Sequence, residues 1–169
     1  MMFTVGLREE AEKAAAETLS QVWDPTFIPV DPIEIAGSIG IQVFVTELKT
    51  GVSGAISIKP GGRASIYLAR GDSLNRQRFT AAHEIGHYRR RELLGKLAEA
   101  HEVWEVRGPL AATGQDADEI FANSFAAALL MPRAVVVSRR AQGESALDLS
   151  YAMEVSAEAM GYRLRNLGV

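Results

Sequence analysis

The sequence contains no cysteine, which excludes both disulfide bonds and thiolate ligands for a metal. It also has no excess of basic residues, because 18 lysines and arginines stand against 21 aspartates and glutamates. The resulting net charge of −3 gives no general attraction to phosphates, so we expect no direct nucleic-acid partner. Long hydrophobic runs are missing as well, since the longest covers only residues 125–132 and is too short to span a bilayer.

The beginning of the chain lacks the basic segment and apolar core of a secretory signal, and Arg8, Glu9 and Glu10 follow at once. We therefore expect a cytoplasmic protein with no membrane partner. A length of 169 residues with 47% hydrophobic residues suits one domain with a real core. We predict a single domain over 1–169, with a metal-binding core in 1–131 and a C-terminal helical subdomain in 132–169.

Histidine is scarce, and two of the three histidines occur in the run His83-Glu84-Ile85-Gly86-His87. On a helix, side chains four residues apart share a face, so His83 and His87 would direct two imidazoles at one tetrahedral zinc ion. Glu84 lies about 100° further round, where it suits proton transfer from a metal-bound water better than ligation. This spacing is typical of zinc peptidases. The alternative is a solvated surface helix that happens to carry two histidines.

A catalytic zinc ion needs a third protein ligand, for which the sequence offers His101 or a downstream acid. We favour Glu119, because it opens the helix predicted over 117–131. It shares a face with Ala122, a small residue that would let this helix approach the motif helix. Gly86, which costs a helix about 1 kcal/mol relative to alanine, also suits such an approach. Asn123 could hydrogen-bond a metal ligand and fix its orientation.

The remaining patterns predict an α+β fold. Alternating β-branched residues predict strands over 41–45, 52–58 and 64–68, which we expect to form a small antiparallel three-stranded sheet. In the third strand, Ile66 and Leu68 should face one side and Ser65 and Tyr67 the other. The segment 92–115 is interpreted as a helix extension followed by a loop. Helical periodicity and capping residues predict further helices over 7–22, 31–38, from about 74, 135–140, 147–153 and 156–166.

Two runs, QRFTAAHEIGHY at 77–88 and EIFANSFAAALLMP at 119–132, closely resemble the ImmA/IrrE family of metallopeptidases. The run at 52–56 and the residues at 155–156, 163–164 and 167–168 fit the same family, so the likeness covers about residues 30–168. The resemblance implies a zincin-like core with zinc on His83, His87 and Glu119 and with Glu84 as general base. Manganese is the alternative metal.

The resemblance further implies an intracellular endopeptidase that cuts a helix-turn-helix transcriptional repressor. Cleavage would relieve repression of stress-response or mobile-element genes, and some relatives act as the toxin half of a two-gene module. Candidate donors to the oxyanion are Tyr88, Tyr67 and His101. We also expect that a substrate strand could add to the sheet near residues 65–68.

Two other functions remain open from the sequence. The helices predicted over 147–153 and 156–166 have helix-turn-helix dimensions, which would suit DNA binding. From residue 132 onward, however, five arginines are nearly balanced by four acids, and phosphate binding needs a clear basic excess. Packing on the catalytic half or docking of a repressor fits this balance better. A second alternative is a protein that keeps the metal and sequesters its partner without cutting it. The run at 89–91 (RRR) is expected to be solvated at a helix end, with an acidic partner as the alternative.

Overall fold

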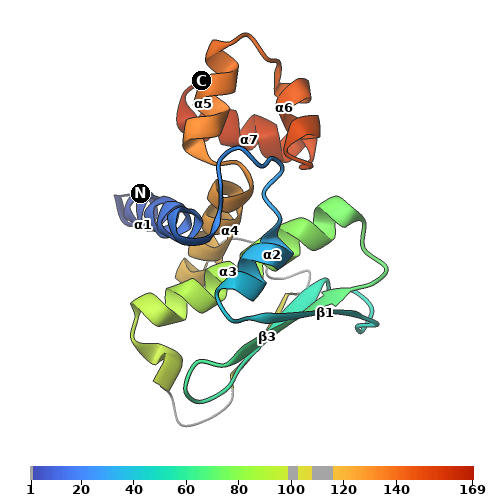
Figure 1. The fold of residues 1–169 in the computed structure, drawn as a ribbon. Coiled ribbons are helices and arrows are strands. Elements are labelled where there is room, and N and C mark those ends of the chain that lie inside the picture. The colour runs from blue at the N-terminus through green and yellow to red at the C-terminus, as the bar shows by residue number, and fades with distance from the viewer. Residues whose placement is uncertain (1, 99–102, 108–115) are drawn as a thin grey trace.

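The computed structural model describes residues 2–98, 103–107 and 116–169, so His101 and the segment 108–115 lie outside the described residues. The chain forms an α+β fold, as predicted (Figure 1). In order, the elements are α1 (Met2–Val22), α2 (Pro32–Ser38), β1 (Gln42–Thr46), β2 (Gly54–Ile58), β3 (Ala64–Ala69), α3 (Leu74–Leu93), η1 (Lys96–Ala98), β4 (Val103–Arg107), α4 (Ala117–Leu130), α5 (Arg133–Ala141), α6 (Ala146–Ala152) and α7 (Ala157–Leu167).

The sheet differs from the predicted one in both strand number and direction. Its order is β1-β3-β2-β4, with β2 antiparallel to β3 and β4, whereas β1 runs parallel to β3. The prediction of three antiparallel strands was wrong because alternation identifies a strand but carries no information about its direction. The predicted faces of β3 are correct, since Ile66 and Leu68 are fully buried while Ser65 and Tyr67 are partly exposed.

The fourth strand lies in the segment that we interpreted as a helix extension and loop. In the structure α3 ends at Leu93, and β4 pairs with β2 so that Glu105 lies opposite Ile56. As a consequence β3 lies inside the sheet, between β1 and β2, and the edge strands are β1 and β4. A substrate strand cannot add near residues 65–68, because both sides of β3 already have partners.

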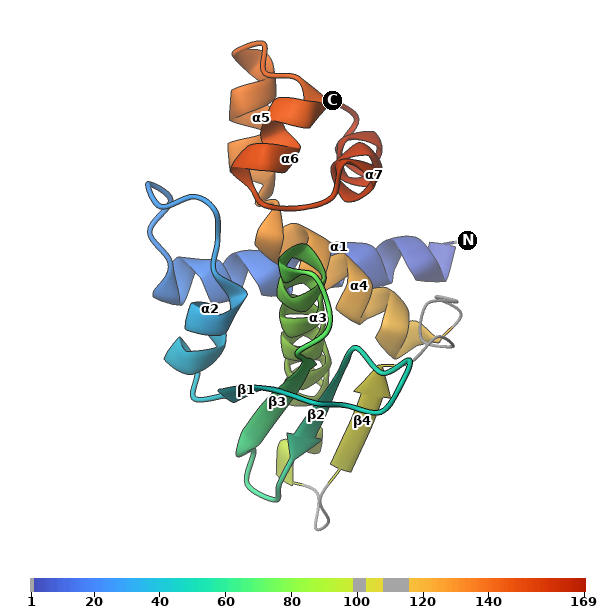
Figure 2. The ribbon, with the colours of Figure 1, turned by 90° about the vertical axis from the view of Figure 1, so that its right-hand side faces the viewer.

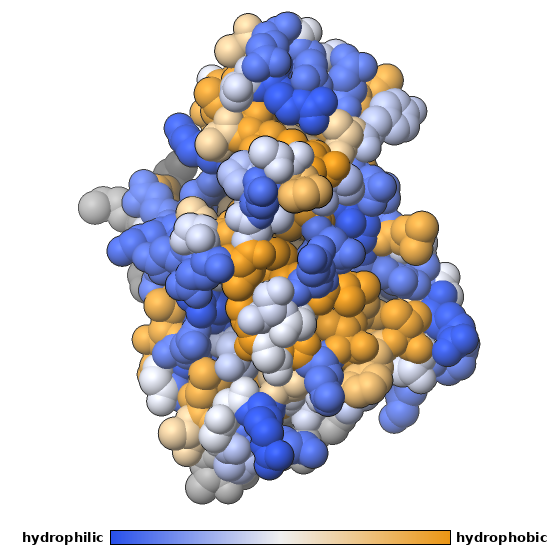
Figure 3. Space-filling view, in the orientation of Figure 1, coloured by the Kyte–Doolittle hydropathy of each residue, from blue (hydrophilic) through white to orange (hydrophobic). Residues whose placement is uncertain are grey.

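The motif helix α3 lies on one face of the sheet, and α4 packs against α3 and α1 (Figure 2). The hydrophobic core between these elements includes five fully buried residues, Ile56, Ile66, Ile85, Phe121 and Phe125. The face that carries α2 and β1 shows a band of apolar residues across its middle (Figure 3). The exposed apolar side chains of α2 and β1 include Ile33, Phe44 and Val45.

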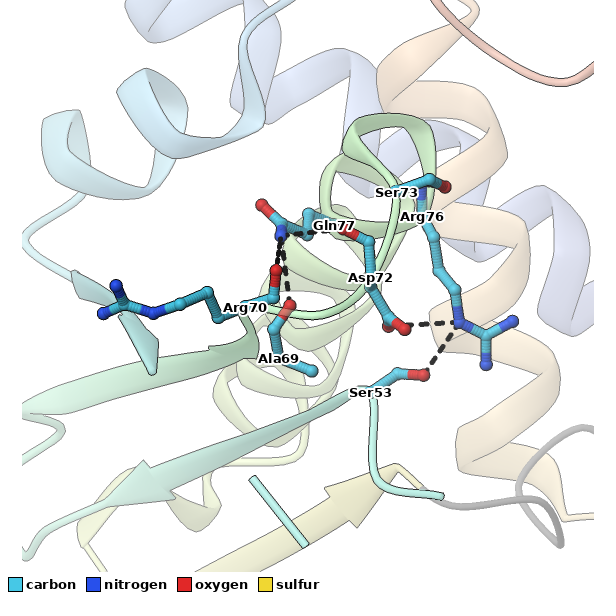
Figure 4. A network of polar contacts seen from close by, with 7 residues as sticks. All are labelled: Ser53, Ala69, Arg70, Asp72, Ser73, Arg76 and Gln77. Carbon is cyan, nitrogen blue, oxygen red and sulfur yellow. Dashed lines mark hydrogen bonds and ion pairs between the residues drawn. The ribbon is translucent and has the colours of Figure 1, made fainter. Parts of the chain in front are cut away.

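The start of α3 is fixed to the sheet by polar contacts (Figure 4). The Ser73 side chain caps the helix by accepting from the Arg76 amide. Gln77 Nε2 donates to the carbonyl oxygens of Ala69 and Asp72, both at 3.0 Å, and thereby holds the loop between β3 and α3. These contacts set where α3 begins and therefore which residues reach the sheet.

Two arginines connect the C-terminal helices α5 to α7 to the rest of the molecule. Arg163, 5% exposed, donates to both carboxylate oxygens of Glu12 at 2.6 and 2.7 Å and to the Met131 carbonyl at 2.9 Å. Arg78 of α3 donates to the Val30 carbonyl at 2.8 Å and pairs with Glu154 at 3.4 Å. Burial lowers the pKa of Arg78, and Glu154 opposes this shift.

Within the described ranges, no single helix has both the length and the apolar composition of a membrane span, although α4 and α5 reach them together across a 50° bend.

Candidate metal centre

The site begins at the crossing of α3 and α4, where two small residues meet. A Cβ placed on Gly86 would lie 2.9 Å from Ala122 Cα, closer than real Cβ atoms approach other atoms, and a tight 3.1 Å from Ala122 O. Only glycine therefore permits this separation of the two helices. The prediction that Gly86 and Ala122 allow a close approach is confirmed.

This crossing brings His83, His87 and Glu119 together. The Nε2 atoms of the two histidines lie 2.9 Å apart. Glu119 Oε2 lies 3.5 Å from His83 Nε2, and Glu119 Oε1 lies 3.2 Å from His87 Nε2. The three residues form a group able to hold a metal ion, with both histidines buried and the Glu119 side chain 21% exposed.

The donor atoms fit a tetrahedral cation. Ligand bonds of about 2.0–2.1 Å at tetrahedral angles place neighbouring donors about 3.3 Å apart. The two histidine Nε2 atoms lie 2.9 Å apart, and each lies 3.5 or 3.2 Å from one of the two Glu119 oxygens, so the group has about the size that such an ion requires. Among the described residues, Glu119 Oε2 is buried yet has no hydrogen-bond partner. A buried carboxylate oxygen in that position is stabilised when it binds a cation. The residues present therefore fit a zinc ion held by two imidazoles and one carboxylate.

Asn123 fixes the orientation of one of these imidazoles. Its Oδ1 lies 3.0 Å from His83 Nδ1. When Nδ1–H donates to Asn123, the neutral ring keeps the Nε2 lone pair directed at Glu119 and His87. This contact is the one that the sequence analysis assigned to Asn123.

Replacing Asn123 with alanine should weaken zinc binding by about 10- to 100-fold, because the His83 ring loses the acceptor that sets its tautomer. A competitive titration against a chromophoric chelator measures this affinity. Ser124→Ala is the matched control, because the Ser124 hydroxyl donates to the Ile120 carbonyl of its own helix. Equal zinc affinity in Asn123→Ala and the unaltered protein would contradict the orienting role.

Glu84 lies beside the metal group but faces the start of β2. It is 1% exposed, and a Cβ on Gly54 would lie 3.5 Å from its Oε1 and 2.3 Å from Thr80 Cγ2. Gly54 thus lets the strand approach the face of α3 that carries Thr80 and Glu84. The Gly54–Thr80 contact was not predicted from the sequence. The spacing of four between Thr80 and Glu84 was the available signal, because it places both on one helix face.

The structure places two of the candidate oxyanion donors, Tyr67 and Tyr88, away from the start of β2, where Glu84 lies. Tyr67 lies on the face of β3 opposite Ile66 and Leu68 and stacks on Phe44 with ring centroids 5.5 Å apart. The Tyr88 hydroxyl lies 3.6 Å from the position of a Gly62 Cβ, at the far end of β2 from Gly54. Burial raises the pKa of Tyr88, and Glu92 adds to this shift. His101 lies outside the described residues.

The arginine run after the motif is less solvated than we predicted. Arg90 pairs with Glu10 of α1 at 2.8 Å and with Asp118 of α4 at 3.2 Å, and its guanidinium lies 5.2 Å from the centroid of Phe121. Arg89 pairs with Glu92 of its own helix. The acidic partners of Arg90 therefore belong to the chain itself, and they hold α1, α3 and α4 together near Glu119.

Comparison with known proteins places this site in a family context. The model of a peptidase family described as the IrrE N-terminal-like domain matches residues 36–165. That range contains all three residues of the metal group as well as Glu84, Asn123 and Gly54. A search of curated proteins finds no match.

Proposed function

The chain belongs to the IrrE N-terminal-like family of peptidases, and from this premise we propose that it is a zinc-dependent endopeptidase that cuts a helix-turn-helix transcriptional repressor. The single observation that carries the catalytic part of the proposal is the convergence of His83, His87 and Glu119 beside Glu84. Membership of this family supports the interpretation of the chain as a metallopeptidase of the IrrE/ImmA type. The substrate, the biological role in stress or mobile-element genes and the choice of zinc over manganese are part of the proposal.

In this mechanism the chain supplies the ligands and a base. His83, His87 and Glu119 would hold the ion. When bound, zinc would lower the pKa of a water molecule towards neutrality and polarise the peptide carbonyl. Glu84 accepts a proton from the attacking water and then delivers it to the leaving amine. The burial of Glu84 keeps bulk water away from this proton transfer.

An extended substrate has one suitable sheet edge beside the base. Strand β4 is an edge strand, and it pairs with β2 so that Arg107 lies opposite Gly54, the residue adjacent to Glu84. A peptide segment that adds to the outer side of β4 near Arg107 would lie level with Gly54 and Glu84, with β4 between it and β2. This edge replaces the one that we expected near residues 65–68.

The contacts of the C-terminal arginines favour protein docking over DNA binding. Arg163 is buried against Glu12, Arg139 pairs with Glu144 at 2.6 Å, and Arg140 donates to the Glu144 carbonyl. Side chains that are paired within the chain contribute little to phosphate binding. We therefore propose that α5 to α7 support the catalytic half or receive the repressor rather than bind duplex DNA.

Incubation with a purified candidate repressor tests the proposed activity. The zinc-loaded protein should produce two repressor fragments whose masses define one cut, and a chelator should prevent the cut until zinc is restored. A stable complex with intact repressor would instead establish the sequestering alternative. A salt-dependent mobility shift on duplex DNA, with no effect on any repressor, would overturn the proposal.

A further inference from the structure

Arg76 lies on the same face of α3 as Glu84, nearer the start of the helix. Residues 76, 80 and 84 are spaced by four and therefore stack along one face. This face crosses the start of β2, because Arg76 Nε donates to Ser53 Oγ at 2.9 Å while Thr80 and Glu84 lie against Gly54. A rise of 1.5 Å per residue places Arg76 about 12 Å from Glu84 along the helix.

The guanidinium of Arg76 is held by its inner nitrogen. Nε donates to Ser53 Oγ and also to Asp72 Oδ2 at 3.1 Å. The terminal nitrogens point away from both acceptors (Figure 4), and the side chain is 62% exposed. Two oriented terminal N–H groups form a fork that can bind a carboxylate through parallel hydrogen bonds.

The simpler interpretation is a surface ion pair with Asp72, four residues earlier on the chain. Such exposed pairs contribute little and do not hold a side chain in one place. Arg76 differs from such a pair because its Nε also donates to Ser53, which is only 4% exposed and belongs to the segment that leads into β2. The Ser53 hydroxyl anchors Arg76 over the strand end next to the base.

We propose that Arg76 selects substrates that carry an aspartate or glutamate three or four residues from the cleaved bond. This inference rests on the proposed peptidase function. An extended peptide advances about 3.3 Å per residue, so about 12 Å corresponds to three or four residues. Because Asp72 neutralises the charge of Arg76, the pair exerts little electrostatic attraction on a distant substrate. Recognition therefore depends on direct bidentate contact with the terminal nitrogens.

Cleavage of a peptide library by the zinc-loaded protein tests this proposal. The probe is a chymotryptic library from total cell protein, in which mass spectrometry identifies each new cut. Acidic residues should be enriched about fivefold at one position three or four residues from the cut, the upper range for an exposed charge pair. Arg76→Gln should remove the enrichment, and Arg76→Glu should replace it with lysine and arginine.

Arg70→Gln is the matched control. Arg70 is also an exposed arginine in the loop that leads into α3, but it contacts Glu47 and the Val45 carbonyl and points away from Arg76 (Figure 4). This variant should keep the acidic preference. Two results would overturn the role of Arg76 but leave the proposed peptidase function intact. One is cleavage by the unaltered protein without acidic enrichment, and the other is acidic enrichment that persists in Arg76→Gln. Absence of any cleavage would overturn the peptidase function as well.

Discussion

Replacing Glu84 with glutamine is expected to lower peptide cleavage by about 10²- to 10⁴-fold while zinc binding stays unchanged. Glutamine has nearly the same shape, so the packing against Gly54 and Thr80 is retained. It cannot accept the proton of the attacking water, which is the step that the position of Glu84 supports. Cleavage rates and zinc titrations on the same preparation separate the two properties.

Glu92→Gln serves as the control for this change. Glu92 belongs to the same helix but pairs with Arg89 near its end, away from the metal group, so cleavage should continue at the original rate. Full activity in Glu84→Gln would remove Glu84 as the base. A loss of zinc from Glu84→Gln would make Glu84 a ligand.

Replacing Gly86 with alanine should both destabilise the fold and weaken the metal site. The added methyl group meets the Ala122 backbone at 2.9 and 3.1 Å, so α4 must move away from α3. Overpacking of this kind costs about 1–3 kcal/mol of unfolding free energy. Because α4 carries Glu119 and α3 carries both histidines, the same movement separates the ligands. Urea unfolding of the metal-free protein and a zinc titration measure the two effects.

Gly6→Ala is the matched control, because Gly6 also lies in a helix but its Cβ would meet nothing within 4 Å. There the same change should stabilise the helix by up to about 1 kcal/mol and leave zinc affinity unaltered. If Gly86→Ala behaved like Gly6→Ala, the close crossing of α3 and α4 would not be what positions Glu119.

The parts of the site that were predictable from sequence are those that a helix determines locally. The spacing of His83 and His87 fixes their common face, and the pairing of Gly86 with Ala122 follows from side-chain size. Glu119 was favoured for the same reason, since it precedes Ala122 by three residues on one helix. These inferences use the repeat of an α-helix and the volume of a side chain, and for Glu119 also the usual zinc ligand set of two histidines and one glutamate.

The sheet was less predictable because strand pairing depends on residues far apart in the chain. The five residues of β4 include Glu105 and Arg107, so their apolar alternation is too weak to identify a strand without its partner β2. β1 pairs with β3, the second strand of the β2–β3 hairpin, and not with β2. The two strands of the hairpin run in opposite directions, so β1 is parallel to its neighbour β3. The position of Arg76 over Ser53 depends on this same hairpin and could not be seen in the sequence.

The hydrogen bonds of Arg163 to Glu12 and to the Met131 carbonyl limit how far the chain can be truncated from its C-terminal side. Met131, Val136, Leu149 and Met160 belong to one continuous buried cluster with Phe125 of α4. A fragment that stopped after α4 would lose Arg163, the counter-ion of Glu12. It would also lose the apolar residues of α5 to α7 that pack with the end of α4. Removing α5 to α7 from this protein would thus destabilise the helix that carries Glu119, even though none of the deleted residues belongs to the metal group.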